Sequence, residues 1–168
     1  MEEVEKWQHL VCTLRSGIAK LPKPSEEELK RGLFRGVSGL FCSHEVGCAL
    51  KWGSFTSLTT NLETAKDTFA HGKVVYEIQG IPEWAIGKLD HLSQYPNEYE
   101  VLMAPGLLFV VEEHTRQAGI EHYVKLRYIG PGATGASVRS SLPCVWCRLV
   151  RAVAAGDAPL ALQLLQLP

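Results

Sequence analysis

Two glutamates separated by a single residue, Glu98 and Glu100, are the side chains best suited to chemistry in this sequence. Pro96 and Asn97 precede them and favour a turn, whereas the run Tyr99–Met103 is typical of a strand. In an extended chain, residues i and i+2 point to the same side about 7 Å apart, so we expect both carboxylates to face one site. One could stabilise a developing positive charge and the other could accept a proton. The alternative is a pair of exposed glutamates on an edge strand.

Two motifs upstream of this pair carry polar groups that could act together with the carboxylates: a guanidinium in the first and two hydroxyls in the second. Arg35 lies in a short apolar run and is followed by Gly36, while Ser57 and Thr59 flank Leu58. A guanidinium can bind two phosphate oxygens at once, which a lysine cannot do. Alternatively, the arginine is an ordinary surface residue, the glycine forms a turn, and the alternating hydroxyls reflect only strand propensity.

The elements that must position these groups are helices first and strands afterwards. Periodic apolar residues predict a helix over residues 2–20, and Ser25 with Glu28 forms a capping box that begins a second helix. Asn61 is expected to begin a helix that runs through Phe69. Strands are expected over 73–79, 98–104, 107–112 and 121–129, with weak alternation over 49–60. This order favours an α+β domain.

The chain has the length and composition of one globular domain. It has 168 residues, and we expect a single domain with a core of about residues 30–130, a helical part over 1–29 and a helical tail over 142–168. The tail resembles the first helix of a helical repeat, which suggests a larger parent protein. The formal net charge of −1 and the lack of a long apolar run indicate neither a nucleic-acid nor a membrane partner. The acidic N-terminus predicts a cytoplasmic protein, or a secreted one if a signal has been removed.

Cysteines do not indicate a metal site or a disulfide framework. Five are present, and Cys144 and Cys147 have the C-x-x-C spacing of zinc and redox sites. No second such pair and no histidine at ligand spacing accompanies them, so we expect buried or unbridged thiols and no metal. The six histidines form no arrangement of a nucleophile with its base.

Taken in order, the three motifs resemble those of the vertebrate-type arginine-specific mono-ADP-ribosyltransferases, which share their core with several bacterial ADP-ribosylating toxins. The matching segments are residues 33–37 (LFRGV), 52–59 (WGSFTSLT) and 95–102 (YPNEYEVL), and the resemblance covers Trp7 to Ile129. It implies the α+β ADP-ribosyltransferase fold: two packed, mostly antiparallel sheets, a small N-terminal helical layer and a cleft for NAD. It also implies a glycosyltransferase-class enzyme that moves ADP-ribose from NAD to an arginine of a protein acceptor and releases nicotinamide, without a metal.

The resemblance gives four catalytic side chains distinct roles. Arg35 would bind the NAD pyrophosphate, and Ser57 would hydrogen-bond the carboxylate of Glu100. Glu100 would stabilise the oxocarbenium-like transition state and bind the ribose 2′-hydroxyl. Glu98 would orient the acceptor guanidinium and accept its proton, because a protonated guanidinium is a poor nucleophile.

Other residues near the motifs are implied to bind NAD or to pack. Gly36 would let the nicotinamide carboxamide approach the backbone, and Thr59 would support its strand and contribute a second hydroxyl. Leu58 replaces the threonine of the usual Ser-Thr-Ser pattern, which puts the packing of that strand in question. Packing rather than ligand stacking is the expected role of the aromatic residues Trp52, Phe69, Tyr95 and Tyr99.

Three alternatives remain open. The same residues would serve an NAD glycohydrolase, in which water replaces the acceptor arginine. Leu58 is the one feature that favours a non-catalytic NAD-binding or protein-interaction module. The repeat-like tail suggests a structural domain of a larger scaffold.

Overall fold

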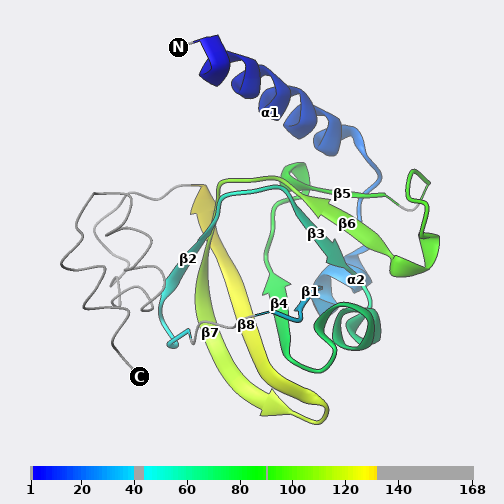
Figure 1. Ribbon diagram of the computed structural model, residues 1–168, viewed down its shortest axis with the longest axis vertical. Helices are drawn as coiled ribbons and strands as arrows, with labels where there is room; N and C mark the ends of the chain where they lie inside the picture. Colours follow the sequence, from blue (N-terminus) through cyan, green and yellow to red (C-terminus); the bar gives the residue numbers. More distant parts are fainter. Residues whose placement is uncertain (1, 40–43, 90, 132–168) are drawn as a thin grey trace, which may run out of the picture.

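The computed structural model describes residues 2–39, 44–89 and 91–131, with side chains from His9 to Gly130 (Figure 1). The expected tail over 142–168 and Cys144 with Cys147 therefore lie outside the described residues. Two helices precede eight strands, as the α+β prediction requires. None of the described helices combines the length and the apolarity that crossing a bilayer demands.

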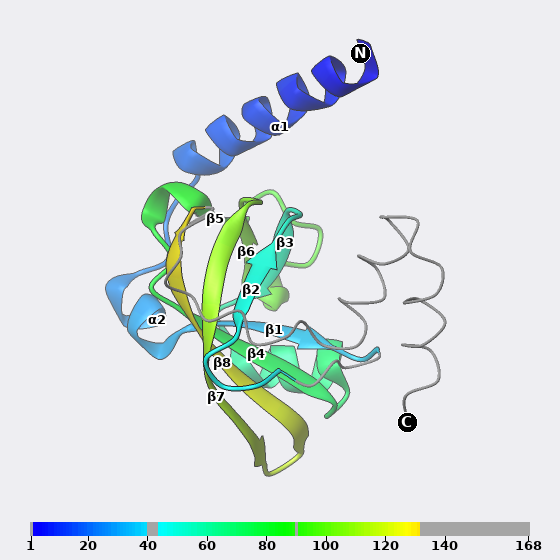
Figure 2. The ribbon, with the colours of Figure 1, turned by 90° about the vertical axis from the view of Figure 1, so that its left-hand side faces the viewer.

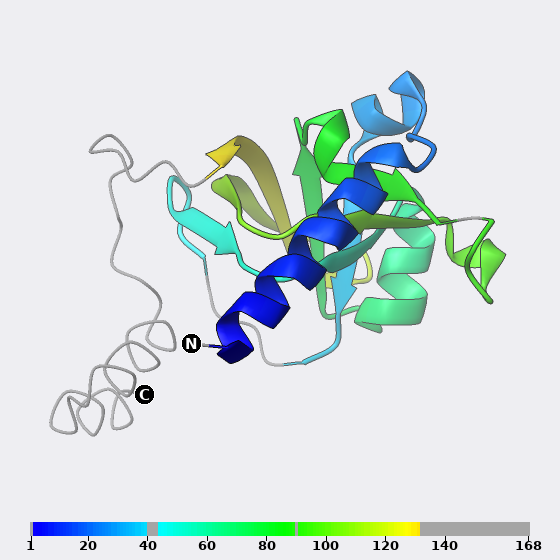
Figure 3. The same cartoon turned by 90° about the horizontal axis from the view of Figure 1, so that it is seen from above.

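Helix α1 (Glu2–Lys20) lies across one end of the molecule, above the start of β5 (Figures 1 and 3). Its last turn packs on the short 3₁₀ helix η2 (Glu83–Ala85) and on β5, and Ile18 is 2% exposed there. Leu10 and Leu14 are exposed, so the expected apolar stripe is buried only toward its C-terminal end. The helix therefore projects from the body along most of its length, as Figure 2 shows.

Two short helical segments begin where the sequence predicts. In α2 (Glu26–Arg31) the Ser25 hydroxyl accepts from the Glu28 N–H, and the Glu28 carboxylate accepts from the Ser25 N–H. The Asn61 side chain accepts from two backbone N–H groups at the start of the next segment, η1 (Thr64–Ala70). η1 is a π-helix, which is a geometry that the sequence did not indicate.

The eight strands form one sheet in the order β2-β7-β8-β4-β1-β3-β6-β5. Every neighbouring pair is antiparallel except β4 with β8, which is parallel. The strands are β1 Leu33–Val37, β2 Ala49–Trp52, β3 Thr56–Thr59, β4 Val74–Gln79, β5 Ile86–Lys88, β6 Glu100–Met103, β7 Leu107–Gln117 and β8 Ile120–Pro131.

The sheet bends at the contact between β1 and β3, where Phe34 opposite Thr59 is the one pair that joins them. This joint divides the sheet into a part with β3, β6 and β5 and a part with the other five strands. The resemblance led us to expect two packed, mostly antiparallel sheets, and the backbone pairing connects the two parts into one sheet. Both contribute to one hydrophobic core, for example through Leu58 of β3 and Phe109 of β7, so they still pack on each other.

A buried acidic group connects β4 with β8. Glu77 is 8% exposed, and its carboxylate accepts hydrogen bonds from the Tyr123 hydroxyl at 2.5 Å and from the Gln79 amide. Lys125 lies 3.4 Å away and supplies a compensating charge. A buried carboxylate is stable only with such partners, so these contacts fix the Tyr123 ring in place.

Replacing Tyr123 by phenylalanine is expected to lower the free energy of unfolding by about 1–3 kcal/mol at neutral pH, because a buried carboxylate loses a donor. Burial and the hydrogen bond to Glu77 raise the pKa of Tyr123 above its usual value. The contribution of Tyr123 is therefore complete below about pH 10 and declines above it, because the unfolded tyrosine then ionises while the folded one stays protonated. Urea denaturation of both proteins at neutral pH and again above about pH 10 tests this. The exposed Tyr95→Phe is the control, and an equal loss in both variants would contradict the role of the bond.

Candidate active site

The three sequence motifs meet on three adjacent strands, β1, β3 and β6 (Figure 1). Thr59 of β3 lies opposite Phe34 of β1 on one side and opposite Glu100 of β6 on the other. Adjacent strands are about 4.8 Å apart, so this row places the arginine motif within two strand spacings of the catalytic candidate Glu100. Segments that are far apart in the sequence thus converge at one place, as the resemblance predicted.

Arg35 connects β1 to β3 next to Phe34 and Thr59, the single residue pair that joins the two strands. Its Nη1 donates to the backbone carbonyl of Ser57 at 2.9 Å, so the guanidinium is held against the neighbouring strand. Burial lowers the pKa of Arg35 from its usual value, and nearby Tyr76 partly offsets this effect. The group remains protonated at neutral pH, and its other N–H groups can bind an anion.

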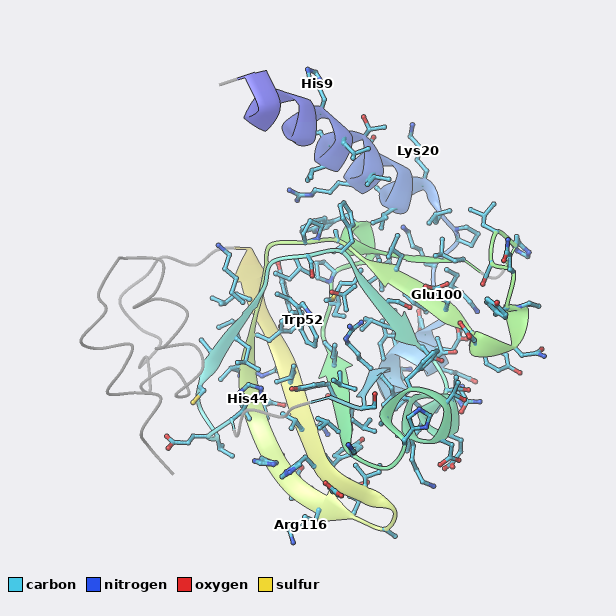
Figure 4. All side chains as sticks on the ribbon, viewed as in Figure 1. His9, Lys20, His44, Trp52, Glu100 and Arg116 are labelled. Carbon is cyan, nitrogen blue, oxygen red and sulfur yellow. The ribbon has the colours of Figure 1, made fainter. Side chains whose placement is uncertain are left out.

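Ser57 and Glu100 are diagonal neighbours on the same face of β3 and β6. Ser57 pairs with Leu102 and Thr59 pairs with Glu100, and diagonal positions are about 7–8 Å apart. Ser57 is exposed and Glu100 is partly buried at the start of β6, where Figure 4 labels it. Among the described residues, no hydrogen bond joins these two side chains, so the serine contact to this carboxylate that the resemblance implied is not formed in the structure. Both groups therefore remain able to bind a ligand between them.

The expected strand geometry of the glutamate pair is wrong. Glu98 ends the 3₁₀ turn η3 (Pro96–Glu98), and Tyr99 adopts a left-handed conformation with φ 50° and ψ 45°. β6 begins only at Glu100. The reason is the turn that Pro96 and Asn97 start, which extends two residues farther than the sequence suggested. Alternation along a strand therefore does not relate the two carboxylates.

Thr59 anchors both glutamates instead. It is 1% exposed, and its hydroxyl donates to the Glu98 carbonyl at 2.7 Å and accepts from the Asn61 N–H at 3.1 Å. Its backbone pairs with that of Glu100. The proton and one lone pair of this hydroxyl are therefore engaged within the protein, whereas the resemblance implied a second hydroxyl for the ligand. Within the described chain, no hydrogen bond or ion pair occupies the carboxylate of Glu98 or of Glu100.

Gly36 is a glycine because η1 packs directly on it. A Cβ there would lie 2.0 Å from the Ala65 carbonyl oxygen and 2.6 Å from the Ala70 amide nitrogen. The space of the missing side chain is thus filled by protein and does not admit a ligand. Its backbone pairs with Val75 of β4, while the described pairing of β1 with β3 is at Phe34, so the edge of Gly36 that faces β3 remains open.

Replacing Gly36 by alanine is expected to lower the free energy of unfolding by about 3 kcal/mol, because η1 must move away from β1. Gly53→Ala is the matched control, since a Cβ there meets nothing within 4 Å. Urea denaturation of both variants measures the difference. Equal stability of the two variants would show that the contact with η1 is easily relaxed.

Residues around the motifs follow the expectation in part. Trp52 makes edge contacts with Tyr76 and Phe109 and packs as predicted. Leu58, whose effect on the strand the sequence left in question, is buried in the core. Tyr95 and Tyr99 are 65% and 44% exposed, so the prediction that they pack under the loop is wrong. Phe69 is partly buried, and its Cβ lies against Gly36; sequence reasoning counted it as core and missed its place beside the site.

No group of three or more metal-ligand side chains occurs among the residues that the structure describes. Of the described cysteines, Cys12 is exposed and Cys48 is partly buried. His114 and His122 are in hydrogen-bond contact at 3.1 Å on the β7–β8 hairpin, and both strands are separated from β6 in the strand order by β4, β1 and β3. These groups take no part in the site.

Comparison with known proteins agrees with this geometry. A family model described as NAD:arginine ADP-ribosyltransferase matches residues 4–132. The erythroblast NAD(P)(+)–arginine ADP-ribosyltransferase of Gallus gallus is 31% identical over 114 residues, which cover 66% of this chain and 35% of that protein. The chain thus matches about a third of the length of this relative.

Two solved structures show the same fold. The Vis toxin of Vibrio splendidus has a TM-score of 0.54 at 24% identity, over 79% of this chain and 59% of that one. The enzymatic component C2-I of the Clostridium botulinum C2-toxin has a TM-score of 0.57 at 13% identity, over 76% and 36%. The family match spans most of the 168 residues and includes all three motifs, so the chain belongs to the NAD:arginine ADP-ribosyltransferase family.

Proposed function

We propose that this protein transfers ADP-ribose from NAD to the guanidinium group of an arginine in a protein acceptor and releases nicotinamide. The observation that carries the proposal is the convergence of Arg35, Ser57 and Glu100 on adjacent strands in a chain of this family. The named relative acts on arginine with NAD(P).

NAD would bind beside β1 and β3, which share only the backbone pair of Phe34 with Thr59. The pyrophosphate would bind the N–H groups of Arg35 that Ser57 does not use, in a two-oxygen contact that suits a guanidinium. The nicotinamide would approach the backbone edge of Gly36 that faces β3. The guanidinium of Arg35 is partly buried, so its attraction to the pyrophosphate is screened less by water than it would be on an exposed side chain.

Bond cleavage would leave a positive charge on the ribose. The bond between the ribose C1′ and the nicotinamide nitrogen breaks, and its electron pair stays on nicotinamide, which leaves as a neutral molecule. The remaining ribose cation is oxocarbenium-like, and the carboxylate of Glu100 would stabilise it. The Ser57 hydroxyl, diagonal to Glu100, would hydrogen-bond the carboxylate or the ribose once the ligand fills the gap.

Bond formation would use Glu98. The acceptor guanidinium is protonated at neutral pH and must lose a proton to react. Glu98 would accept this proton as the new bond forms between C1′ and a guanidino nitrogen, and the proton then passes to water. Thr59 holds the backbone of Glu98 and so keeps the carboxylate near Glu100.

The direct test uses the purified chain with NAD and agmatine, the guanidino compound with which the Vis toxin was crystallised. We expect equal amounts of nicotinamide and of an agmatine adduct, with the linkage located on the guanidino group by mass spectrometry. Nicotinamide release without an adduct would identify an NAD glycohydrolase. Binding of NAD without release would identify a non-catalytic module. Equal labelling of lysine or cysteine side chains would refute the arginine assignment.

A further inference from the structure

A cavity of about 580 Å³ lies beside Tyr99, the residue between the turn η3 and strand β6. The lining comes from α2, from the start of β1 and from the segment between β3 and η1. Tyr99, between η3 and β6, and one residue of β8 complete it. These residues are Glu28, Arg31, Phe34, Thr60, Asn61, Leu62, Tyr99 and Tyr123. Arg35, Ser57 and Glu100 do not line it, whereas their chain neighbours Phe34 and Tyr99 do, so the cavity adjoins the proposed NAD site.

The inner walls of the cavity are apolar and rigid. Phe34 and Tyr123 are each 6% exposed and pack in one cluster with Leu62 at its edge. The Tyr123 hydroxyl is turned toward Glu77, to which it donates at 2.5 Å. Its ring is therefore fixed, and the cavity is suited to an apolar or aromatic side chain.

The charged groups of the cavity leave one positive charge without compensation. The carboxylate of Glu28 is already paired with Lys88 at 3.2 Å and accepts from the Ser25 N–H. Arg31 donates through Nε to the Glu27 carbonyl, and within the described part of the chain no carboxylate forms an ion pair with it. The cavity therefore favours a ligand that carries a negative charge near its apolar group.

The position of Tyr99 connects the cavity to the acceptor side of the reaction. Tyr99 lines the cavity and stands between Glu98 and Glu100 in the chain, and its left-handed backbone holds it exposed at the cavity mouth. A polypeptide whose arginine reaches Glu98 must place its neighbouring residues close to Tyr99. A small guanidino compound has no such residues and does not reach the cavity.

We propose that this cavity binds the residues that flank the target arginine of the acceptor, with an apolar or aromatic side chain inside and an acidic side chain at Arg31. The proposal rests on the proposed function and specifies the acceptor class as arginines in an apolar and acidic sequence context. The cavity would thus select protein acceptors, while the glutamates act on any guanidinium.

The test compares agmatine with two peptides, one with Phe and Asp next to a single arginine and one with Ala and Lys in the same places. We expect the KM of the Phe-Asp peptide to be about tenfold lower than that of the Ala-Lys peptide, which corresponds to about 1.4 kcal/mol. Arg31→Glu should remove or reverse this preference and leave kcat and KM for agmatine unchanged. Lys30→Glu is the matched control, because it makes the same charge change on α2 and Lys30 does not line the cavity.

The outcomes separate the two proposals. If agmatine is not modified, the proposed function fails. If agmatine is modified but the two peptides have equal KM values, the cavity proposal is overturned. It is also overturned if Arg31→Glu and Lys30→Glu change the ratio of the two peptide KM values equally. The same holds if Arg31→Glu changes the KM for agmatine as much as the KM for the peptides. A second variant, Leu62→Glu, places a negative charge at the edge of the cavity. It should raise the KM for the Phe-Asp peptide and leave the KM for agmatine unchanged.

Discussion

Replacing Glu100 by glutamine is expected to lower both ADP-ribose transfer and NAD hydrolysis by a factor of about 10²–10³, which is the usual effect of losing one electrostatic contact to a transition state. Glutamine has nearly the same shape, so the backbone pairing with Thr59 remains. What disappears is the negative charge beside the ribose as it becomes cationic. Because both reactions pass through this cation, both must slow together.

The measurement is the initial rate of nicotinamide release with and without agmatine, together with the affinity for NAD. The affinity should change little, since the proposed pyrophosphate contact to Arg35 is intact. Glu113→Gln in β7 is the control, because it removes one exposed carboxylate far from β3 and β6 in the strand order. Retention of either activity in Glu100→Gln would remove Glu100 from the catalytic role.

Replacing Glu98 by glutamine is expected to separate the two reactions. Transfer to agmatine should fall by about 10²–10³, because the acceptor guanidinium loses the base that takes its proton. NAD hydrolysis should remain within about threefold of the parent rate, since water needs no such orientation and Glu100 is unchanged. The hydrogen bond from Thr59 goes to the backbone carbonyl of Glu98, so the substitution leaves the loop in place.

Transfer and hydrolysis are measured in one reaction by quantifying the adduct and unmodified ADP-ribose. Raising the pH should partly restore transfer in Glu98→Gln, because a larger fraction of the acceptor is then deprotonated. Glu63→Gln, in an exposed position next to η1, controls for loss of charge. A parallel fall of transfer and hydrolysis would show instead that Glu98 acts on NAD.

The local features of the fold were predictable from the sequence because they depend on neighbouring residues. The Ser25 capping box and the Asn61 cap each satisfy backbone N–H groups within three residues, and both occur as predicted. The strand content was also predictable, since β-branched and aromatic residues mark most of it. The meeting of Arg35, Ser57 and Glu100 followed from the family resemblance rather than from any local pattern.

The features that sequence reasoning missed depend on contacts between distant segments or on turn geometry. The Thr59 hydroxyl binds the carbonyl of Glu98, 39 positions away, and no local pattern reports such a contact. The packing of η1 on Gly36 likewise requires both elements to be placed first. The turn at Glu98 could have been found, because Pro96 and Asn97 are turn residues and their influence extends to the next positions.

The hydrogen bond from Arg35 to the Ser57 carbonyl has an entropic consequence for nucleotide affinity. An arginine side chain has about 2 kcal/mol of rotamer entropy to lose when it becomes ordered. Here the strand contact restricts the rotamers before any nucleotide arrives, so part of that loss belongs to folding and not to association. Binding of NAD at Arg35, as proposed, would therefore involve a side chain that is already preorganised, so less conformational entropy would be lost on binding.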